Sequence, residues 1–307
     1  STGTPTLTGS NGFNQENYDF SYGAADLTVN QRAITLTALE QDRIYGNTLT
    51  LNDTAFTILD RDGGATLPNG EVVTNVTINS ATGVDASTTA NVGTYTDEIV
   101  ISGPVTGTPG TGDGFLESNY DITYVAGDLR VDQRAITVTP SQQEKTYGDV
   151  LVLDNTAFTV TDLDGDAALP NGEVIDTVNV ISRGGHDAST TSNAVTHTDD
   201  LEITSFGSGS NGFNPDNYVF DFSNLADFVI NRRAATINAL AQEKDYGDVL
   251  DLGNTAFAVV DRDGGALPNG ENIDTVTLVS AAGIDASTDA DAGVYADNIT
   301  VVPTSTG

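Results

Sequence analysis

The sequence predicts an all-β protein built of tandem antiparallel β-sandwiches arranged as an extended rod. Three observations lead to this prediction. A sequence segment of about 100 residues recurs along the chain, and this length is the size of a single domain. Apolar and polar residues alternate within each block. No flexible linker stands where one block passes into the next.

The repeat is visible in several motifs that keep the same order. The segment "NGFNQENYDFSYGAADLTV" at Asn11 returns as "DGFLESNYDITYVAGDLRV" at Asp113 and as "NGFNPDNYVFDFSNLADFV" at Asn211. The motif "LPNGE" occurs at Leu67, Leu169 and Leu267, and "DAST" occurs at Asp85, Asp187 and Asp285. Motifs that recur three times in the same order indicate a repeated structural unit rather than a unique catalytic site.

Each block reads as a series of short strands. In "RAITLTAL" the apolar residues Ile34, Leu36 and Ala38 alternate with threonines, and the runs between turns are rich in β-branched and aromatic residues. About seven such strands per block, with turns every 8–12 residues, are typical of an immunoglobulin-like sandwich. No segment has a sustained helical stripe, so we expect little helix.

The repeat predicts the domain boundaries. Residues 32–133 and 134–232 form two full immunoglobulin-like repeats, residues 1–31 read as the closing strands of a split repeat, and residues 233–307 read as the opening strands of another. The last residues, "PTSTG", and the first, "STGTPTLTG", share the letters "STG", so the two stretches can be joined as one continuous repeat sequence. Two explanations stay open: one period of a longer tandem array, which we favour, or separate copies that complete each other's split domain by strand addition.

Composition limits the partners. The 11 basic and 44 acidic residues give a formal charge of −33, which repels nucleic acid and anionic lipid. We therefore expect no nucleic-acid partner and no direct membrane insertion, since no apolar run reaches the roughly 20 residues of a membrane helix. The chain contains no cysteine, so it has no disulfide and no thiolate site. This composition is typical of secreted proteins on the bacterial cell surface, and we expect an extracellular location.

An acidic segment before each "LPNGE" is the best candidate for a cofactor site. In "TDLDGDAALPNGE" the side chains of Asp162, Asp164 and Asp166 alternate, and Glu173 follows at the offset of an EF-hand calcium ligand. Ala167 stands where that loop needs glycine. The other copies offer fewer ligands, namely Asp60, Asp62 and Glu71 in the first and Asp261 and Asp263 in the third. Calcium is one hypothesis for these positions, and an acidic β-turn exposed to solvent is the alternative.

Three repeated arginines stand at the predicted junctions. Arg32, Arg134 and Arg233 each open a repeat in a strongly anionic chain. Each either anchors a carboxylate across the boundary or is a solvated charge at a strand end. The same carboxylates recur in every repeat, which argues against a unique catalytic cleft, so we do not expect an enzyme.

Four motifs carry a family resemblance. In order they are "QRAITVTPSQQEKTYGD", "LPNGE", "NVGTYTDEIVIS" and "SNYDITYVAGDLRV". Together they resemble the MBG-type repeats of large bacterial surface and haemagglutinin-like adhesins. The resemblance implies β-rich, immunoglobulin-like modules stacked in tandem outside the cell, with a spacer role and no catalytic activity.

The expected function is therefore structural. We expect a stiff spacer or fibre-forming segment of a bacterial adhesin, biofilm matrix fibre or surface filament, whose partners are neighbouring repeats or copies of itself head-to-tail. Two alternatives remain: a multivalent module that binds glycan or protein in cell adhesion, and a subunit that self-assembles by strand complementation.

Overall fold

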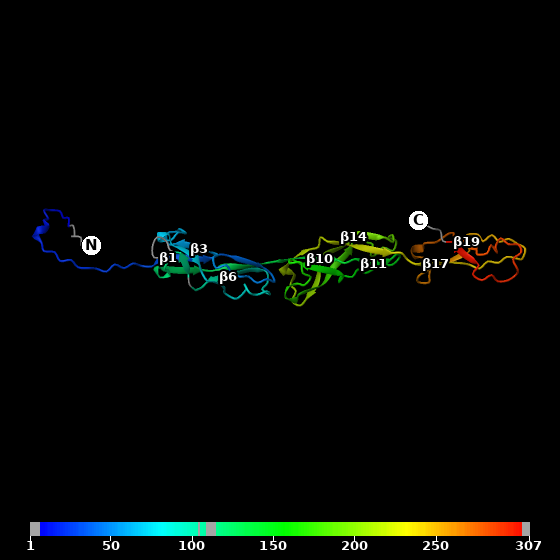
Figure 1. Cartoon of the computed structure of the whole chain (residues 1–307), viewed down its shortest axis with the longest axis horizontal. Coiled ribbons are helices and arrows are strands. Elements are labelled where there is room, and N and C mark those ends of the chain that lie inside the picture. The colour runs from blue at the N-terminus through cyan, green and yellow to red at the C-terminus, as the bar shows by residue number, and fades with distance from the viewer. Residues whose placement is uncertain (1–6, 104, 109–114, 303–307) are drawn as a thin grey trace. The chain divides into compact units, whose positions relative to one another are not determined.

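The computed structural model describes residues 7–103, 105–108 and 115–302. Their regular structure consists of β-strands and short 3₁₀ turns, so the all-β prediction is confirmed (Figure 1). No helix among them is long or apolar enough to cross a membrane. The overlap between "PTSTG" and "STGTPTLTG" falls largely outside the described residues.

Contacts between Cα atoms divide the chain into two compact units. Unit 1 contains Ser1–Gln41, Leu51–Thr82 and Asp97–Asp128, and unit 2 contains Asp42–Thr50, Gly83–Thr96 and Leu129–Gly307. Unit 2 therefore includes three segments of the first repeat, the last of them residues 129–133, together with the second and third repeats. The domain boundaries expected from the repeat stay a prediction.

The described residues of the first repeat form three sheets. A three-stranded sheet has the order β3-β1-β8, a four-stranded sheet has the order β2-β9-β6-β5, and β4 pairs with β7. The strands are β1 (Arg32–Ala38), β2 (Gln41–Ile44), β3 (Phe56–Asp60), β4 (Val72–Asn75), β5 (Ile78–Ser80), β6 (Gly93–Ile101), β7 (Thr106–Thr108), β8 (Tyr120–Val125) and β9 (Gly127–Asp132).

The second repeat follows the same plan with two sheets. Their orders are β12-β10-β15 and β11-β16-β14-β13. The strands are β10 (Arg134–Pro140), β11 (Gln143–Thr146), β12 (Phe158–Asp162), β13 (Val174–Ser182), β14 (Thr196–Ser210), β15 (Tyr218–Asp221) and β16 (Leu225–Asn231).

Within residues 233–302 the third repeat contains two strand pairs. β17 (Ala235–Ala239) pairs with β18 (Phe257–Asp261), and β19 (Thr277–Ser280) pairs with β20 (Ile299–Val302).

The expectation of purely antiparallel sheets is wrong at three strand pairs. β1 runs parallel to β8, β10 to β15 and β11 to β16. In each case the opening part of a repeat pairs with its closing part. The strands of such a pair are far apart in sequence, and that separation permits the parallel arrangement, which a short hairpin does not.

The six 3₁₀ turns in the described part of the chain come from two motifs. The turns η1 (Gln15–Asn17), η3 (Glu117–Asn119) and η5 (Pro215–Asn217) contain the asparagine that precedes the "NY" tyrosine, and η2 (Pro68–Gly70), η4 (Pro170–Gly172) and η6 (Pro268–Gly270) are the "PNG" of "LPNGE". Asn69, Asn171 and Asn269 have φ of 59°, 60° and 59°. Asparagine tolerates this left-handed conformation better than most residues, so the same sharp turn forms three times.

The core confirms the alternation seen in the sequence. Ile34, Leu36 and Ala38 on β1 are buried, as are Ile136 and Val138 on β10. In the second sheet of each full repeat the closing strand contributes two fully buried residues, Leu129 and Val131 on β9 and Phe228 and Ile230 on β16. Burial of large aliphatic and aromatic side chains is the main favourable contribution to folding.

Candidate functional site

Each repeat opens with an arginine that binds the aspartates of the acidic turn. Arg134 Nε and Nη2 lie 3.0 and 2.7 Å from Asp162 Oδ2, and Nη2 also donates to Asp164. The antiparallel register of β10 and β12 pairs Ile136 with Asp162, which places the aspartate beside the arginine. Arg134 and Asp162 are both buried, so this ion pair lies away from water.

The same ion pair occurs in the other two repeats. Arg233 Nε and Nη2 lie 2.7 and 2.6 Å from the two oxygens of Asp261, and Nη2 also donates to Asp263. Arg32 binds Asp60 and Asp62 in the same way. A planar guanidinium matches the two oxygens of a carboxylate, which explains why arginine rather than lysine stands at these positions.

The ion pairs change the acidity of the buried aspartates. Burial raises the pKa of Asp162, but the hydrogen bonds from Arg134 and from the backbone N–H groups of Asp164 and Asp166 outweigh it, so this pKa falls below its usual value. The hydrogen bond from Arg233 lowers the pKa of Asp261 to about 2. A lowered pKa means that each ion pair contributes stability above about pH 4, the ordinary range of an aspartate, and loses it as the pH falls further.

A buried glutamate lies next to the arginine in the second repeat. Glu173 follows the "PNG" turn and accepts hydrogen bonds from two tyrosines. Tyr45 Oη donates to Glu173 Oε1 at 2.5 Å, and Tyr218 Oη donates to Oε2. The two rings meet edge to face with centroids 5.6 Å apart. Tyr45 belongs to the first repeat, so Glu173 connects two repeats.

These contacts hold the two phenols in the neutral state. Burial, and then the hydrogen bond to Glu173, raise the pKa of both Tyr45 and Tyr218. Burial raises the pKa of Tyr120 to about 12, and the hydrogen bond to Glu71 adds to the effect. Because a raised pKa favours the neutral phenol in the fold, this contribution is complete below about pH 10 and is lost at higher pH.

The arginine also reaches into the preceding repeat. Arg134 Nη1 donates to the Tyr45 carbonyl at 3.4 Å and to Asn47 Oδ1 at 3.1 Å. Gly46 stands between them with φ of 87°, and a Cβ there would lie 2.5 Å from Pro170. Glycine is therefore needed both for its backbone conformation and for the close approach of the proline.

We call this arrangement the clasp: Arg134, Asp162, Glu173, Tyr45 and Tyr218. Its five side chains join the opening strand, the acidic turn, the "PNG" turn and the closing strand of one repeat to the "YG" turn of the repeat before it.

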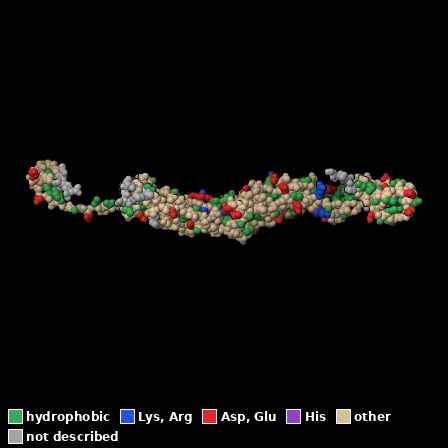
Figure 2. Space-filling model, viewed as in Figure 1, with side chains coloured by type: hydrophobic (Ala, Val, Ile, Leu, Met, Phe, Trp, Pro, Cys, Tyr) green, Lys and Arg blue, Asp and Glu red, His purple; other side chains and the backbone are tan. Residues whose placement is uncertain are grey.

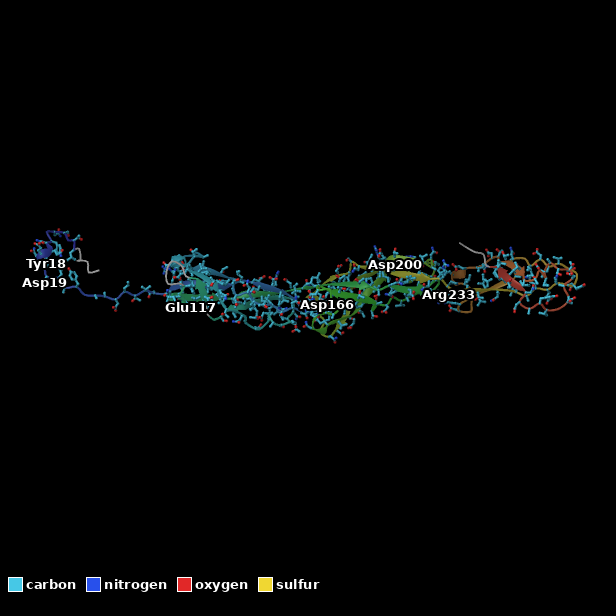
Figure 3. All side chains as sticks on the ribbon, in the orientation of Figure 1. Tyr18, Asp19, Glu117, Asp166, Asp200 and Arg233 are labelled. Atoms are coloured by element: carbon cyan, nitrogen blue, oxygen red, sulfur yellow. The ribbon has the colours of Figure 1, made fainter. Side chains whose placement is uncertain are left out.

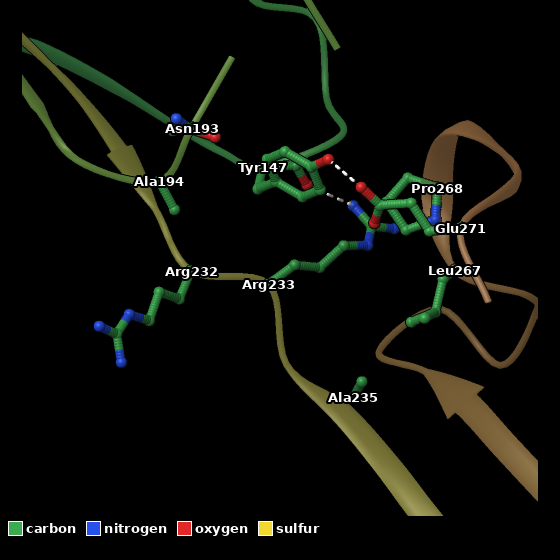
Figure 4. A pocket seen from close by; sticks show the side chains of 9 residues that line it. All are labelled: Tyr147, Asn193, Ala194, Arg232, Arg233, Ala235, Leu267, Pro268 and Glu271. Carbon is green, nitrogen blue, oxygen red and sulfur yellow. Dashed lines mark hydrogen bonds between the residues drawn. The ribbon is translucent and has the colours of Figure 1, made fainter. Parts of the chain in front are cut away.

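A second clasp joins the second and third repeats. Figure 4 shows Tyr147 pointing toward Glu271, with the Arg233 side chain reaching the same place. Arg233 Nη1 donates to the Tyr147 carbonyl at 3.3 Å and to Asp149 Oδ1 at 2.6 Å. We predicted that each arginine binds a carboxylate of the neighbouring repeat. Arg233 does so at Asp149. Arg134 instead binds the Tyr45 carbonyl and the Asn47 side-chain amide oxygen of the preceding repeat.

The candidate calcium residues take part in these contacts. Both oxygens of Asp162 are used, Oδ2 by Arg134 and Oδ1 by the backbone N–H groups of Asp164 and Asp166. Both oxygens of Glu173 accept from tyrosines. In the first and third copies the carboxylates of Asp60, Asp62, Asp261 and Asp263 bind arginine, and those of Glu71 and Glu271 accept from a tyrosine.

As arranged, these oxygens do not converge on a point where a calcium ion fits. Within the part of the chain that the structure describes, no group of three or more acidic or histidine side chains could hold a metal ion. Figure 2 shows acidic side chains scattered over the visible face rather than gathered in one patch. Calcium binding stays a prediction, and it would require Asp162 to exchange Arg134 for the ion.

Sequence reasoning missed one contact between the first and second repeats and one contact within the second repeat. Asn217, which is buried, donates to Asn91 Oδ1 and accepts from the Val92 N–H, both at 3.0 Å. Lys145 donates to three carbonyl groups of the "DAST" loop, those of His186, Asp187 and Ser189. The signal in both cases was repetition: asparagine precedes the "NY" tyrosine in every copy, and a basic residue precedes every "YG".

Comparison with known proteins found no matching family model and no similar curated protein. The function must therefore be argued from the clasp itself.

Replacing Arg134 by methionine tests the buried ion pair. We expect R134M to lower the free energy of unfolding of the second repeat by about 3–5 kcal/mol, because Asp162 is left as an uncompensated buried charge. The double variant R134M/D162L should recover most of this loss. Chemical denaturation followed by circular dichroism measures both.

The matched control is R183M. Arg183 forms an exposed pair with Glu202, with its Nε 3.3 Å from Oε2, and such a pair contributes less than about 1 kcal/mol. Equal losses in R134M and R183M would contradict a buried clasp.

The buried tyrosines should lose their phenol protons only at high pH. An absorbance titration of the phenolate should contain a component near pH 12 that disappears in the variant Tyr120→Phe, because burial and Glu71 raise that pKa. The pKa of Tyr218, which burial and Glu173 also raise, should not change in this variant. A titration unchanged by Tyr120→Phe would contradict the contact with Glu71.

Proposed function

We propose that this chain is a structural extracellular module, a stiff spacer or fibre-forming segment of a bacterial adhesin, matrix fibre or surface filament. In this proposal its repeats are immunoglobulin-like β-sandwiches that follow one another as an extended rod. The mechanism is mechanical: ladder hydrogen bonds resist extension of each repeat, and the junctions limit bending.

The observation that supports the proposal best is the recurrence of the clasp. The same residue types, arginine, aspartate, glutamate, tyrosine, glycine and proline, meet at two successive junctions, at Arg134 and at Arg233. Domains that move independently of one another are joined by a solvated linker without packed contacts. A junction with a buried ion pair and a glycine packed on a proline instead has one preferred geometry.

Two features of the sequence agree with this role. The four ordered motifs resemble the MBG-type repeats of large bacterial surface proteins, for which a spacer role is expected. The formal charge of −33 keeps acidic faces of neighbouring molecules apart and favours solubility. The acidic residues at the junctions serve the fold in this proposal, not a catalytic reaction.

The stiffness of a junction can be measured within one chain. Ile181 and Val279 are exposed residues at equivalent positions of β13 and β19, and the chain has no other cysteine to interfere with labelling. With spin labels at I181C and V279C, pulsed electron paramagnetic resonance should give one narrow distance distribution. The variant R233M should broaden it, because the junction loses Asp149, Asp261 and the Tyr147 carbonyl together.

The matched control is R232M, which removes the neighbouring exposed arginine. It should leave the distribution narrow. A broad distribution without any clasp substitution would show a flexible linker and contradict the spacer proposal.

A further inference from the structure

The second repeat contains the two histidines of the chain, and their rings lie against each other. His186 begins the "DAST" loop, residues 186–193, and His197 lies on β14. The ring centroids are 3.7 Å apart, and the angle between the ring planes is 24°. Both residues are half-buried. Two imidazoles from different elements are thus stacked face to face.

The first and third repeats have no histidine at these positions. The "DAST" motif and the strand after it align without a gap as far as position 197 and its counterparts, so the equivalent residues can be read directly. They are Val84 and Ile284 in place of His186, and Tyr95 and Tyr295 in place of His197. The histidine pair is therefore a property of the second repeat and not of the repeat family in general.

A third position differs together with the histidines. Gly184 stands where the first repeat has Thr82 and the third has Ala282. A Cβ at Gly184 would lie 2.3 Å from His186 Nε2 and 3.0 Å from Asp200 Oδ1, so a larger residue there would displace the imidazole. The backbone of the second repeat thus leaves room for the His186 ring where its two sister repeats do not.

Each ring also contacts the end of the "DAST" loop. His186 Nδ1 lies 3.0 Å from Ser192 Oγ. His197 Nε2 lies 3.3 Å from the Asn193 carbonyl oxygen, and because a carbonyl only accepts, this nitrogen carries the proton. Tyr95 makes the equivalent contact through its hydroxyl in the first repeat. The stacked pair therefore connects the first residue of the loop to its last two residues.

The "DAST" loop belongs to the junction with the third repeat. Asn269 Nδ2, in the "PNG" turn, donates to the Thr190 carbonyl at 2.8 Å. Asn193 lines the same cavity as Tyr147 and Glu271, the tyrosine and glutamate of the second clasp (Figure 4). The loop that the histidines hold in place is therefore the loop that meets the next repeat.

The charges around the pair balance one proton better than two. Within the described residues, Asp200 has the one carboxylate within 4.0 Å of an imidazole nitrogen: its Oδ1 lies 3.9 Å from His186 Nε2 and accepts from the Gly184 N–H. Asp200 lies on β14 of the second repeat (Figure 3). Lys145 on β11 places an ammonium group at the His186 carbonyl. The other charged groups nearby have contacts of their own or are exposed: Arg183 with Glu202, Asp187 with Lys145, Asp227 with the Asp199 N–H, and the exposed side chain of Asp199.

We propose that the histidine pair makes the junction between the second and third repeats sensitive to pH. Histidine is the side chain that ordinarily changes its charge between about pH 5 and 8. A pair with one proton stays stacked, because a cation is attracted to the face of a neutral ring and Asp200 lies close by. A second proton places two like charges 3.7 Å apart, so the rings repel each other and separate.

Separation of the rings acts on the junction through the loop. Ser192 and Asn193 lose the ring nitrogens that hold them, and Thr190, which lies between them and His186, no longer has a fixed position for Asn269. The ion pair between Arg233 and Asp261 persists, because the pKa of Asp261 is lowered to about 2. The junction therefore loosens in mild acid without losing its clasp.

The first junction should not respond in this way. Its "DAST" loop carries Val84 and Tyr95 at the two positions, and neither valine nor tyrosine takes up a proton between pH 8 and 5. The inference rests on the spacer of the proposed function and adds its regulation: a segment whose second junction is stiff at neutral pH and bends more freely in mildly acid surroundings.

Pulsed electron paramagnetic resonance at pH 8 and pH 5 tests the response. With spin labels at I181C and V279C, the distance distribution should be narrow at pH 8 and broad at pH 5, and a return to pH 8 should restore it. The variants H186V and H197Y each introduce the residue of the first repeat. Both should keep a narrow distribution at pH 5, because a single histidine cannot carry two charges.

The variants also decide whether other groups cause the change. Broadening at pH 5 that is equal in the unaltered sequence and in H186V would overturn the proposal, because it would come from groups other than the pair. An unaltered sequence that stays narrow at pH 5 would overturn it as well.

Nuclear magnetic resonance tests the stack itself. The chain has two histidines, so histidine-selective isotope labelling reports on these two rings alone. Nuclear Overhauser contacts between the rings should be present at pH 8 and lost at pH 5. Rings that remain in contact at pH 5 with both imidazoles protonated would contradict the repulsion on which the proposal depends.

Failure of this proposal is distinguishable from failure of the proposed function. A narrow distance distribution at both pH values would keep the spacer and remove the pH response. A broad distribution at both pH values would contradict the spacer, and it would remove the pH response of the junction with it.

Discussion

The buried ion pair between Arg134 and Asp162 is the constraint on which the junctions depend. It lies where the opening strand meets the acidic turn, and the remaining N–H groups of the guanidinium reach Tyr45 and Asn47 of the preceding repeat. A charge pair away from water is favourable only while every partner is in place. The arginine therefore couples the fold of one repeat to the position of the next, and the same coupling recurs at Arg233.

The parallel pairing of opening and closing strands has a consequence for the whole chain. Because β1 pairs with β8 and β10 with β15, no repeat is complete until its last strands have been made. Those last strands run directly into the next arginine. The same stretch of backbone therefore completes one repeat and forms the next junction. This double role explains why the sequence around each junction recurs, which a solvated linker would not require.

Much of this fold could be predicted from local pattern. The alternation in "RAITLTAL" correctly placed Ile34, Leu36 and Ala38 in the core, and the absence of a helical stripe correctly indicated β-structure. The parallel pairing of strands could not be predicted, because the alternation of apolar and polar residues along a strand does not indicate which distant strand lies beside it. The clasp was missed for the same reason: Arg134 and Asp162 are 28 residues apart, and Tyr45 and Glu173 are 128 apart. Spacing and charge predicted the carboxylates of the acidic turn as a cation site, but they could not show that Arg134 donates hydrogen bonds to two of them.

The central claim is that the clasp couples neighbouring repeats energetically, and a double-mutant cycle between Tyr45→Phe and Glu173→Gln measures this coupling directly. The two residues belong to successive repeats and meet only through the hydrogen bond at 2.5 Å. The account predicts an interaction energy of about 0.5–3 kcal/mol in the free energy of unfolding, as for residues in one buried network. Losses that add to within about 0.3–0.5 kcal/mol would contradict it, because they would mean that the two repeats fold independently.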